Sequence, residues 1–216
     1  MFLTTTVLAL VSYLLGSIPF GFLAGKAKGV DIRKAGSGNI GATNVFRILG
    51  KGPGIIVLSV DALKGALAVI LTPVVVGDPP CPCYAHELTQ AQVLAGICAI
   101  LGHNYTCWLK FKGGKGIATT AGVFAALAPA AFGIALATWL VVFAASRYVS
   151  LASILAAAVL PVAVWLTGQG ALLIGVSAAL AALAIWKHKA NIQRLLAGTE
   201  NRIGAKKAEP PAEPKT

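Results

Sequence analysis

Charged residues are scarce in this 216-residue chain: Asp, Glu, Lys and Arg make up 12% of it, about half the share that is usual in soluble domains. Hydrophobic residues make up 57%, and the mean hydropathy is +0.80. Such a composition excludes an ordinary water-soluble domain. The chain is predicted to be an integral membrane protein.

Acidic residues are the rarest charged class, with 7 Asp and Glu against 18 Lys and Arg, and the net charge is +11. A basic excess is typical of nucleic-acid-binding proteins. Basic loops also set the orientation of membrane proteins. In a chain this apolar the second explanation is favoured, and no nucleic-acid partner is expected.

The four cysteines lack the spacing of a metal site. Cys81 and Cys83 flank a proline, so a bridge between them would be strained, and Cys98 and Cys107 lie far apart. The sequence therefore predicts neither a metal site nor a cofactor.

Long apolar runs cover most of the chain, and the first, from Phe2 to Ala24, has no basic segment before it. It is predicted to be a retained helix and not a cleaved signal peptide. The run 117–146 has 30 residues and contains Pro129, whereas one upright helix needs ~20. The other apolar runs are 53–76, 88–102, 150–167 and 170–186.

The distribution of positive charge decides how run 117–146 is divided. If it forms two short helices of ~13–17 residues, 17 of the 18 Lys and Arg lie on one side of the membrane. The loops near 77–87 and 167–170, on the other side, have none. The fold class predicted is an all-α polytopic membrane protein with seven transmembrane helices, some of them short, with the N-terminus outside and the C-terminus cytoplasmic.

The expected domain organisation is simple. Residues 1–204 form a single membrane domain, and the Pro-, Lys- and Glu-rich tail 205–216 is predicted to be disordered and cytoplasmic. Ser17, Gly21 and Gly25 have the four-residue spacing that favours close helix packing.

A first polar cluster, GSGNIGATNVFR, occupies residues 36–47. Its glycines match G-x-G-x-x-G, but it follows a membrane helix and no βαβ unit surrounds it, so it is a poor match to a dinucleotide fingerprint. Glycines let backbone N–H groups approach an anion, and a helix beginning near 39–43 would direct its positive end toward that anion. The alternative is a flexible interfacial loop. The candidate binding residues are Gly36, Ser37, Gly38, Asn39, Gly41, Thr43, Asn44 and Arg47.

A second cluster precedes the apolar run 117–146. The stretch Lys112, Gly113, Gly114, Lys115, Gly116 is not a Walker motif, because a glycine follows Gly-Lys where Ser or Thr is needed. It is predicted to form a concave nest of N–H groups with added positive charge. Lys112 has an alternative role as a topological anchor.

A third cluster follows the last apolar run. His188 and Asn191 are three residues apart and are expected on one helical face. The alternative is a structural histidine at the membrane boundary. Within the second run, Asp61 and Lys64 are spaced to form an ion pair, and Asp61 is a candidate for orienting a loop lysine or arginine.

All three clusters are expected on the cytoplasmic side. Together they predict a site for phosphate-bearing groups beside lipid, in which an acyl chain lies between helices.

These motifs resemble the bacterial acyl-phosphate-dependent glycerol-3-phosphate acyltransferase family, known as PlsY. The resemblance covers GSIPFG, GSGNIGATNVFR, DALKG, GHNYTCWLKFKGGKGIAT and HKANIQRLLAGTE, and so nearly the whole chain. Two departures are Tyr105-Thr106, where the family has Phe-Pro, and Lys189, where it commonly has Arg.

The resemblance implies an enzyme of phospholipid biosynthesis in the bacterial inner membrane. It would transfer a fatty acyl group from acyl phosphate to the 1-hydroxyl of glycerol 3-phosphate, giving lysophosphatidic acid and phosphate. No histidine here has Asp five residues later, so the H-x4-D acyltransferase pattern is missing, in agreement with a family that does not use acyl-CoA or acyl carrier protein directly. The partners implied are the two substrates and membrane lipid, and the enzyme is expected to be a monomer without cofactors.

The resemblance also implies roles for residues. Ser37, Thr43 and Asn44 would hold the donor phosphate, and Arg47, Lys115 and His188 would hold glycerol 3-phosphate. Asn191 would orient groups at the reacting carbonyl. Ser37, Asn191 and His188 are the catalytic candidates, and Asp61, Lys64, His103 and Glu200 are supporting candidates. The donor's phosphate is expected to take the proton, with His188 as the alternative base.

Two other classes remain open from the residues alone. A transporter or channel for an organic phosphate also uses basic helix ends, but it would need polar clusters on both faces. A lipid-binding scaffold would explain the basic face but not three donor-rich motifs.

Overall fold

The computed structural model describes residues 2–77 and 85–204, and within these ranges every regular element is helical. Cys81, Cys83 and the tail 205–216 lie outside the described residues. The α-helices are α1 (Phe2–Ser17), α2 (Phe20–Ala27), α3 (Ala42–Leu49), α4 (Lys51–Ile70), α5 (Thr72–Val76), α6 (Ala85–Asn104), α7 (Ile117–Leu127), α8 (Pro129–Ser146), α9 (Val149–Leu166), α10 (Ala171–Lys187) and α11 (Lys189–Leu196). The 3₁₀ helices within the described ranges are η1 (Ile32–Lys34) and η3 (Cys107–Leu109).

The long apolar run 117–146 is divided at Ala128, as predicted. Pro129 is the first residue of α8, where its missing N–H costs no hydrogen bond. The expected lengths are wrong, because α7 has 11 residues and α8 has 18. The break lets α7 pack on α4 while α8 packs on α9.

Within the described residues, four helical segments are long and apolar enough to cross a membrane: Phe2–Ala27, Lys51–Val76, Pro129–Ser146 and Val149–Leu166. A fifth is possible if α10 and α11, bent by 58° at His188, count as one span. α7 is shorter than these segments: its 11 residues rise only about 16 Å, whereas the hydrocarbon core is ~30 Å thick.

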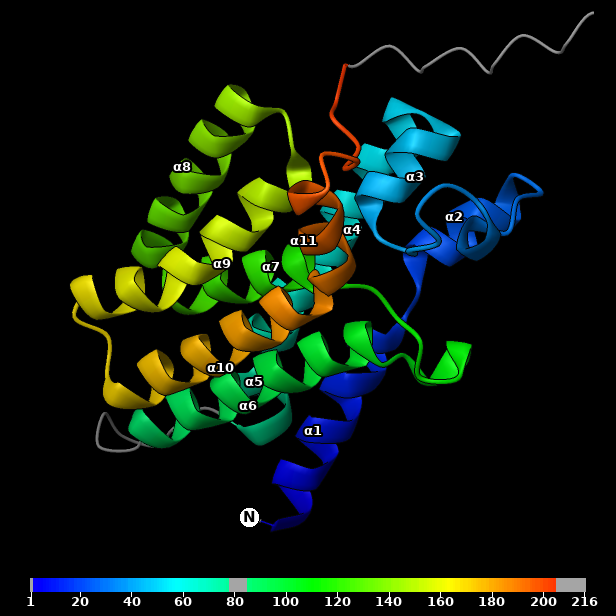
Figure 1. Cartoon of the computed structure of the whole chain (residues 1–216). Coiled ribbons are helices and arrows are strands. Elements are labelled where there is room, and N and C mark those ends of the chain that lie inside the picture. The colour runs from blue at the N-terminus through cyan, green and yellow to red at the C-terminus, as the bar shows by residue number, and fades with distance from the viewer. Residues whose placement is uncertain (1, 78–84, 205–216) are drawn as a thin grey trace, which may run out of the picture.

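The helices pack side by side in one bundle (Figure 1). α1 packs against α6 and α4 against α7, while α9 lies between α8 and α10. The close helix packing predicted for the small residues of the first run is seen at Ser17, whose backbone nitrogen would lie 2.9 Å from a Cβ added at Gly102 of α6. Gly21 instead packs on a loop, since an added Cβ would lie 1.7 Å from the carbonyl oxygen of Ile40. α2 therefore touches the first glycine-rich loop through backbone.

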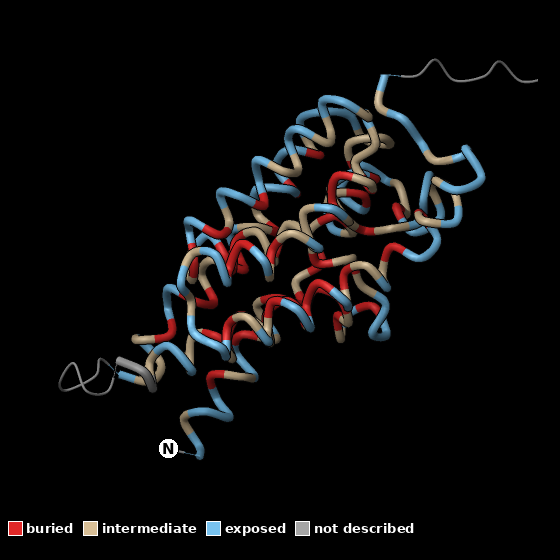
Figure 2. The backbone as a smooth tube through the Cα atoms, turned by 60° about the vertical axis from the view of Figure 1, so that its left-hand side comes forward, coloured by how far each residue is buried: buried red, intermediate tan, exposed pale blue. Residues whose placement is uncertain are grey.

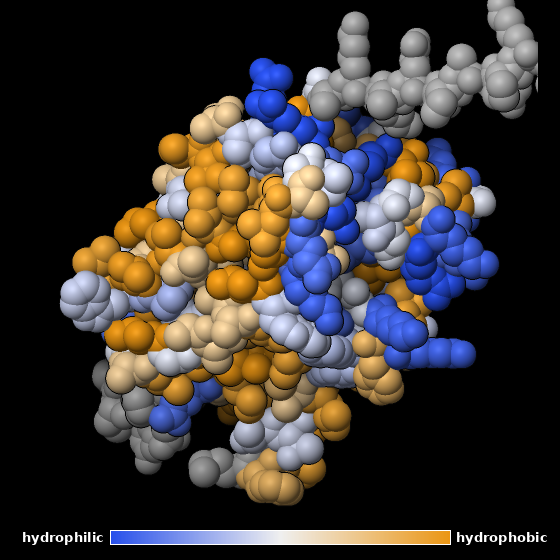
Figure 3. All heavy atoms as spheres, in the orientation of Figure 1, coloured by the Kyte–Doolittle hydropathy of each residue, from blue (hydrophilic) through white to orange (hydrophobic). Residues whose placement is uncertain are grey.

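Burial follows the faces of the helices. Inward turns are buried and outward turns exposed (Figure 2). The main core cluster includes Phe124, Leu160 and Val164, whereas large apolar side chains such as Ile56 and Val141 are exposed. In Figure 3 hydrophobic residues cover most of the visible face, and hydrophilic ones gather toward the end where α2, α3 and α11 lie. Such an outer surface suits lipid, because exposing a large apolar side chain to water costs ~1.5–3 kcal/mol.

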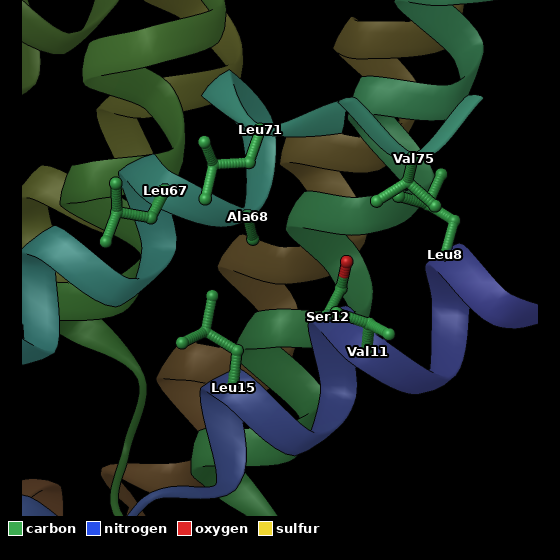
Figure 4. A pocket seen from close by; sticks show the side chains of 8 residues that line it. All are labelled: Leu8, Val11, Ser12, Leu15, Leu67, Ala68, Leu71 and Val75. Atoms are coloured by element: carbon green, nitrogen blue, oxygen red, sulfur yellow. The ribbon is translucent and has the colours of Figure 1, made fainter. Parts of the chain in front are cut away.

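A small apolar groove lies between α1 and the α4–α5 segment (Figure 4). Its volume is about 40 Å³. It contains no titratable side chain and is lined by Leu8, Val11, Ser12, Leu15, Leu67, Ala68, Leu71 and Val75. The groove therefore offers no charged group to a ligand.

Candidate active site

A cavity of about 500 Å³ opens where α3, α4, α7, α8, α9, α10 and α11 meet. One part of its wall is polar and comes from the three clusters that the sequence singles out. The other part is apolar and includes Phe132, Trp139, Ala157 and Leu160. The cavity therefore joins a charged region to a space between apolar helices.

The first glycine-rich loop is held in shape by Asn44 at the start of α3. The side-chain Nδ2 of Asn44 donates to the carbonyls of Ile32, Ala35 and Asn39 at 3.1, 3.0 and 2.9 Å, and its Oδ1 accepts from the N–H of Ser37 at 2.9 Å. Both amide hydrogens of Asn44 are therefore engaged with loop carbonyls and are not free to donate to a phosphate. Asn44 orders the loop, which differs from its expected role in holding the donor phosphate.

The glycines of this loop are expected from the sequence to let backbone N–H groups approach an anion, but the geometry of the loop does not support that role for Gly36 and Gly38. Gly36 and Gly38 have φ of +60° and +70°, which favour glycine, but they do not line the cavity. The N–H of Gly38 donates to Ala35 at 3.1 Å, and that of Gly41 to Asn39 Oδ1 at 2.7 Å. These two amides bond within the loop and are therefore not free to bind an anion.

α3 begins at Ala42, within the range predicted for its start. Thr43 and Arg47 are four residues apart on this helix, which places them on one face, and both line the cavity together with Ser37.

The second glycine-rich loop is anchored to the end of α6. Gly113 N–H donates to the carbonyl of Asn104 at 3.2 Å, and Gly114 N–H to the carbonyl of His103 at 3.0 Å. The last carbonyls of a helix need donors, and these two amides supply them. The predicted nest of free N–H groups is therefore wrong at Gly113 and Gly114, and Lys112 is exposed outside the cavity.

Lys115 connects this loop to the third cluster. Its ammonium donates to Oδ1 of Asn191 on α11. The Nδ2 of Asn191 in turn donates to Oε1 of Glu200 at 2.7 Å. A cation on one side and a carboxylate on the other thus fix the orientation of the Asn191 amide.

Glu200 is the centre of a network that sequence reasoning found only in part. Its carboxylate also accepts from Arg194 Nε at 2.7 Å and from Ser150 Oγ at 2.9 Å. Burial alone would raise the pKa of Glu200, but the hydrogen bonds from Asn191, Arg194 and Ser150 outweigh it, and the net pKa is lowered. Glu200 therefore stays ionised and ties α9 to α11.

Positive charge exceeds negative charge in the polar part of the cavity. Arg47, Lys115 and Arg194 line it, and Glu200 is already bound to several donors. Burial lowers the pKa of Lys115 to about 8, with Glu200 opposing the shift and Arg194 and Arg47 adding to it. An anion entering here would relieve the repulsion among the cations.

His188 lies at the bend between α10 and α11 and is 4% exposed. Its Nδ1 is 2.8 Å from the carbonyl oxygen of Ala184, so this nitrogen carries a hydrogen and donates it. In the neutral ring Nε2 is then free to accept, and His188 also lines the cavity.

Asp61 forms the predicted ion pair with Lys64, with 2.8 Å between Oδ1 and Nζ. Asp61 forms no direct ion pair with a loop lysine or arginine among the described residues, and its other close side-chain neighbour is His103, whose Nδ1 lies 3.6 Å from Oδ1. Among the described residues, no group of three His, Cys, Asp or Glu is arranged to hold a metal ion.

The structure thus brings together most of the predicted residues. Those that line the cavity are Ser37, Asn39, Gly41, Thr43, Asn44, Arg47, Asp61, His103, Lys115, Gly116, His188, Asn191 and Glu200. Gly36, Gly38, Lys64, Lys112, Gly113 and Gly114 do not. Sequence reasoning missed Arg194 as a site residue, and it missed Ser150, one of two serines in the apolar helix α9 that no motif marks.

The fold and the cavity define a helical membrane protein whose site suits an amphiphile with an anionic head. The family model described as glycerol-3-phosphate acyltransferase matches residues 6–198. The chain therefore belongs to the glycerol-3-phosphate acyltransferase family.

Relatives with known names agree along nearly the full length. The glycerol-3-phosphate acyltransferase of Desulforamulus reducens is 48% identical over 207 residues, covering 95% of this chain and 98% of that protein. The one of Geotalea daltonii is 49% identical over 197 residues, covering 90% and 95%.

Two solved structures are also similar. A crystal structure of PlsY, an integral membrane glycerol 3-phosphate acyltransferase, in its glycerol 3-phosphate form has a TM-score of 0.83 and 39% identity, covering 93% of this chain and 96% of that one. The lysophosphatidic acid form of PlsY has a TM-score of 0.81 and 39% identity, covering 93% and 95%.

Proposed function

We propose that this protein transfers a fatty acyl group from acyl phosphate to the 1-hydroxyl of glycerol 3-phosphate, giving lysophosphatidic acid and inorganic phosphate for phospholipid biosynthesis. Membership of the family supports this assignment, as do the two PlsY structures, whose ligand forms are an acceptor and a product of this reaction.

One observation carries the proposal: a single cavity is polar and cationic in one part and apolar in another. Acyl phosphate and lysophosphatidic acid both combine an anionic head with an alkyl chain. The phosphate of lysophosphatidic acid would lie near Arg47 and Lys115, and the phosphate of the acyl donor near Ser37 and Thr43. In both molecules the alkyl chain would lie among the side chains of α7, α8, α9 and α10. A site for a free organic phosphate would not need the apolar part.

The division of roles follows the positions of the donors. Ser37 and Thr43 are assigned to the donor phosphate, and Arg47 and Lys115 to glycerol 3-phosphate, with His188 beside them. Lys115 has two further N–H donors besides the one given to Asn191, and these suit phosphate oxygens. Asn191 is assigned to orienting groups at the reacting carbonyl.

The chemistry needs no covalent enzyme intermediate, because acyl phosphate is a mixed anhydride with a good leaving group. The 1-hydroxyl oxygen forms a bond to the acyl carbon, and the bond from that carbon to the phosphate oxygen breaks. The hydroxyl proton passes to the donor's phosphate, which leaves as inorganic phosphate. The protein's task is to position two anions and stabilise the developing negative charge.

His188 is the alternative base, because its Nε2 is free to accept a proton. Turnover by a His188→Gln variant at no less than about a tenth of the normal rate would exclude it, since general bases contribute ~10²–10⁴-fold. Loss of at least a hundredfold in kcat would assign the proton transfer to His188 instead of the donor phosphate.

The function is tested with purified protein in detergent, acyl phosphate and glycerol 3-phosphate. Equimolar lysophosphatidic acid and phosphate are expected, and acyl-CoA in place of acyl phosphate is expected to give none. A transporter would release no phosphate in this assay, and that result would refute the proposal.

The proposed setting is the bacterial inner membrane, with a monomer of seven spans, the N-terminus outside, and the site and the C-terminus facing the cytoplasm. The gathering of hydrophilic residues at the end of the bundle that holds α2, α3 and α11 supports this orientation (Figure 3). Labelling of single cysteines placed across 129–150 from either side of the membrane tests it. Labelling of Arg147→Cys from the periplasmic side would contradict the proposed topology.

A further inference from the structure

A cluster of buried charged and polar side chains lies beneath the second glycine-rich loop, and the proposed reaction does not use it. Asp61 and Lys64 come from α4, and His103 comes from the last turn of α6. Their side chains are 3%, 2% and 6% exposed. Ionisable groups buried this deeply in a membrane bundle are costly and usually serve a function.

Lys64 is the centre of the cluster. Its ammonium group contacts three acceptors: the carbonyl oxygen of Ile18 at 3.0 Å, Asp61 Oδ1 at 2.8 Å and His103 Nδ1 at 3.0 Å. The contacts with Ile18 and His103 are hydrogen bonds, and the contact with Asp61 is an ion pair. Lys64 thereby joins α4 to the junction between α1 and α2 and to the end of α6.

These contacts fix the state of His103. Nδ1 must accept from Lys64, because an ammonium cannot accept, and the distance from Nδ1 to Asp61 Oδ1 is longer, at 3.6 Å. The ring is therefore neutral and carries its hydrogen on Nε2.

The Nε2 side of His103 lies against the second glycine-rich loop. A Cβ built on Gly114 would lie 2.1 Å from Nε2, so only glycine lets the loop approach the ring this closely. The carbonyl of His103 also accepts from the Gly114 N–H at 3.0 Å. The residue that follows Gly114 is Lys115, which reaches across to Asn191.

We propose that Asp61, Lys64 and His103 act as a positioning cluster that sets the place of the Gly113–Lys115 loop and, through it, the place of the Lys115 ammonium. Asp61 and Lys64 hold the imidazole, and the imidazole supports the loop from below. The influence of this cluster on catalysis rests on the proposed function of Lys115. Its influence on the position of Lys115 is independent of that function.

The first test measures the position of Lys115 without reference to activity. The full-length protein in detergent is labelled briefly with an amine-reactive acetylating reagent, and the labelled lysines are quantified by mass spectrometry. The exposed Lys110 and Lys112 of the same loop are the internal references.

Two variants perturb the cluster. The double variant Asp61→Asn with Lys64→Met removes both charges together, because removing one partner alone would leave a buried charge unpaired. His103→Asn keeps an acceptor near the position of Nδ1 but removes the ring atoms beside Gly114. Lys51→Met, an exposed position on the same helix, is the matched control.

In both cluster variants, labelling of Lys115 relative to the references is expected to rise by roughly fivefold, within the range of couplings found between contacting residues. Lys51→Met is expected to leave it unchanged. If Lys115 labelling is also unchanged in folded His103→Asn protein, the proposal is wrong. His103→Asn alone decides the question if the double variant does not fold.

A second test uses the close contact itself. Gly114→Ala should displace the loop and raise Lys115 labelling in the otherwise unaltered protein, because the added Cβ meets the His103 ring. In the His103→Asn background the same substitution should add less than about twofold, since contacting residues are not additive. Equal effects in the two backgrounds would overturn the proposed contact.

Kinetics separate this proposal from the proposed function. Both cluster variants are expected to raise the KM for glycerol 3-phosphate by roughly tenfold, with a smaller change in the KM for acyl phosphate. The pH at which kcat/KM falls should also shift, because a displaced Lys115 has different surroundings and therefore a different pKa. If labelling rises while these kinetics do not change, the positioning cluster stands, and the assignment of Lys115 to glycerol 3-phosphate fails.

Discussion

The most informative single substitution is Lys115→Met, which keeps the length of the side chain and removes its charge. Lys115 is half-buried beside Arg47 and Arg194 and is held by Asn191. If its ammonium binds the phosphate of glycerol 3-phosphate, the variant loses a hydrogen bond to a charged group, which contributes ~1.5–3 kcal/mol. Because 1.4 kcal/mol corresponds to a factor of about ten, the KM for glycerol 3-phosphate should rise by roughly 10- to 150-fold.

The same substitution should not weaken the empty enzyme. Burial lowers the pKa of Lys115 to about 8, so at pH 7 the folded protein carries a charge that the fold disfavours. A base with a lowered pKa costs stability below the folded pKa, and this cost disappears as the pH rises to the unfolded value. The thermal midpoint of Lys115→Met at pH 7 is therefore expected to equal or exceed that of the unaltered protein.

The assay is phosphate release at varied glycerol 3-phosphate and saturating acyl phosphate, with thermal unfolding measured on the same preparation. Lys110→Met, an exposed lysine of the same loop outside the cavity, is the control and should change neither quantity. A KM within about threefold of normal for Lys115→Met would refute the assignment of Lys115 to the acceptor phosphate. A large loss of stability would refute the electrostatic argument.

Further predictions concern pH, the carboxylate network, helix contacts and the apolar part of the cavity. Glycerol 3-phosphate is a dianion above pH ~6, so kcat/KM should be constant from there up to pH about 8 and fall at higher pH, where Lys115 of the substrate-free enzyme loses its proton. Lys115→Arg should abolish this fall, and a fall that persists in the arginine variant would exclude Lys115 as its source. Glu200→Gln removes the charge that accepts from three side chains and should destabilise the fold by ~1–3 kcal/mol, seen as a lower thermal midpoint, together with a loss of activity; normal stability would show that the network is dispensable. Gly21→Ala places a Cβ 1.7 Å from a backbone carbonyl oxygen and should prevent recovery of folded protein or cost at least ~1–3 kcal/mol, whereas Gly170→Ala, with no atom within 4 Å of the added Cβ, should fold normally. Ala157→Phe should fill the apolar part of the cavity and lower kcat/KM for long acyl phosphates more than for short ones; an equal loss for all chain lengths would place the chain elsewhere.

The amino-acid sequence determined the class of protein and the composition of the site. Hydropathy is a local property, so the apolar runs and the division of run 117–146 at Pro129 were predictable from the residues alone. The three polar clusters were visible because their residues lie close together in the chain. Their meeting in one cavity was predicted from the one-sided charge and is confirmed for Ser37, Lys115 and Asn191.

Tertiary structure decided which groups within the clusters are free to act. Asn44 and the amides of Gly113 and Gly114 have donors suited to an anion, but carbonyls brought beside them by the fold already use these donors. The partners of Glu200 could not be predicted from the sequence either, since one of them, Ser150, is fifty residues away in the chain. Hydrogen bonds between such distant residues depend on which helices become neighbours, and neither local periodicity nor a motif encodes that choice.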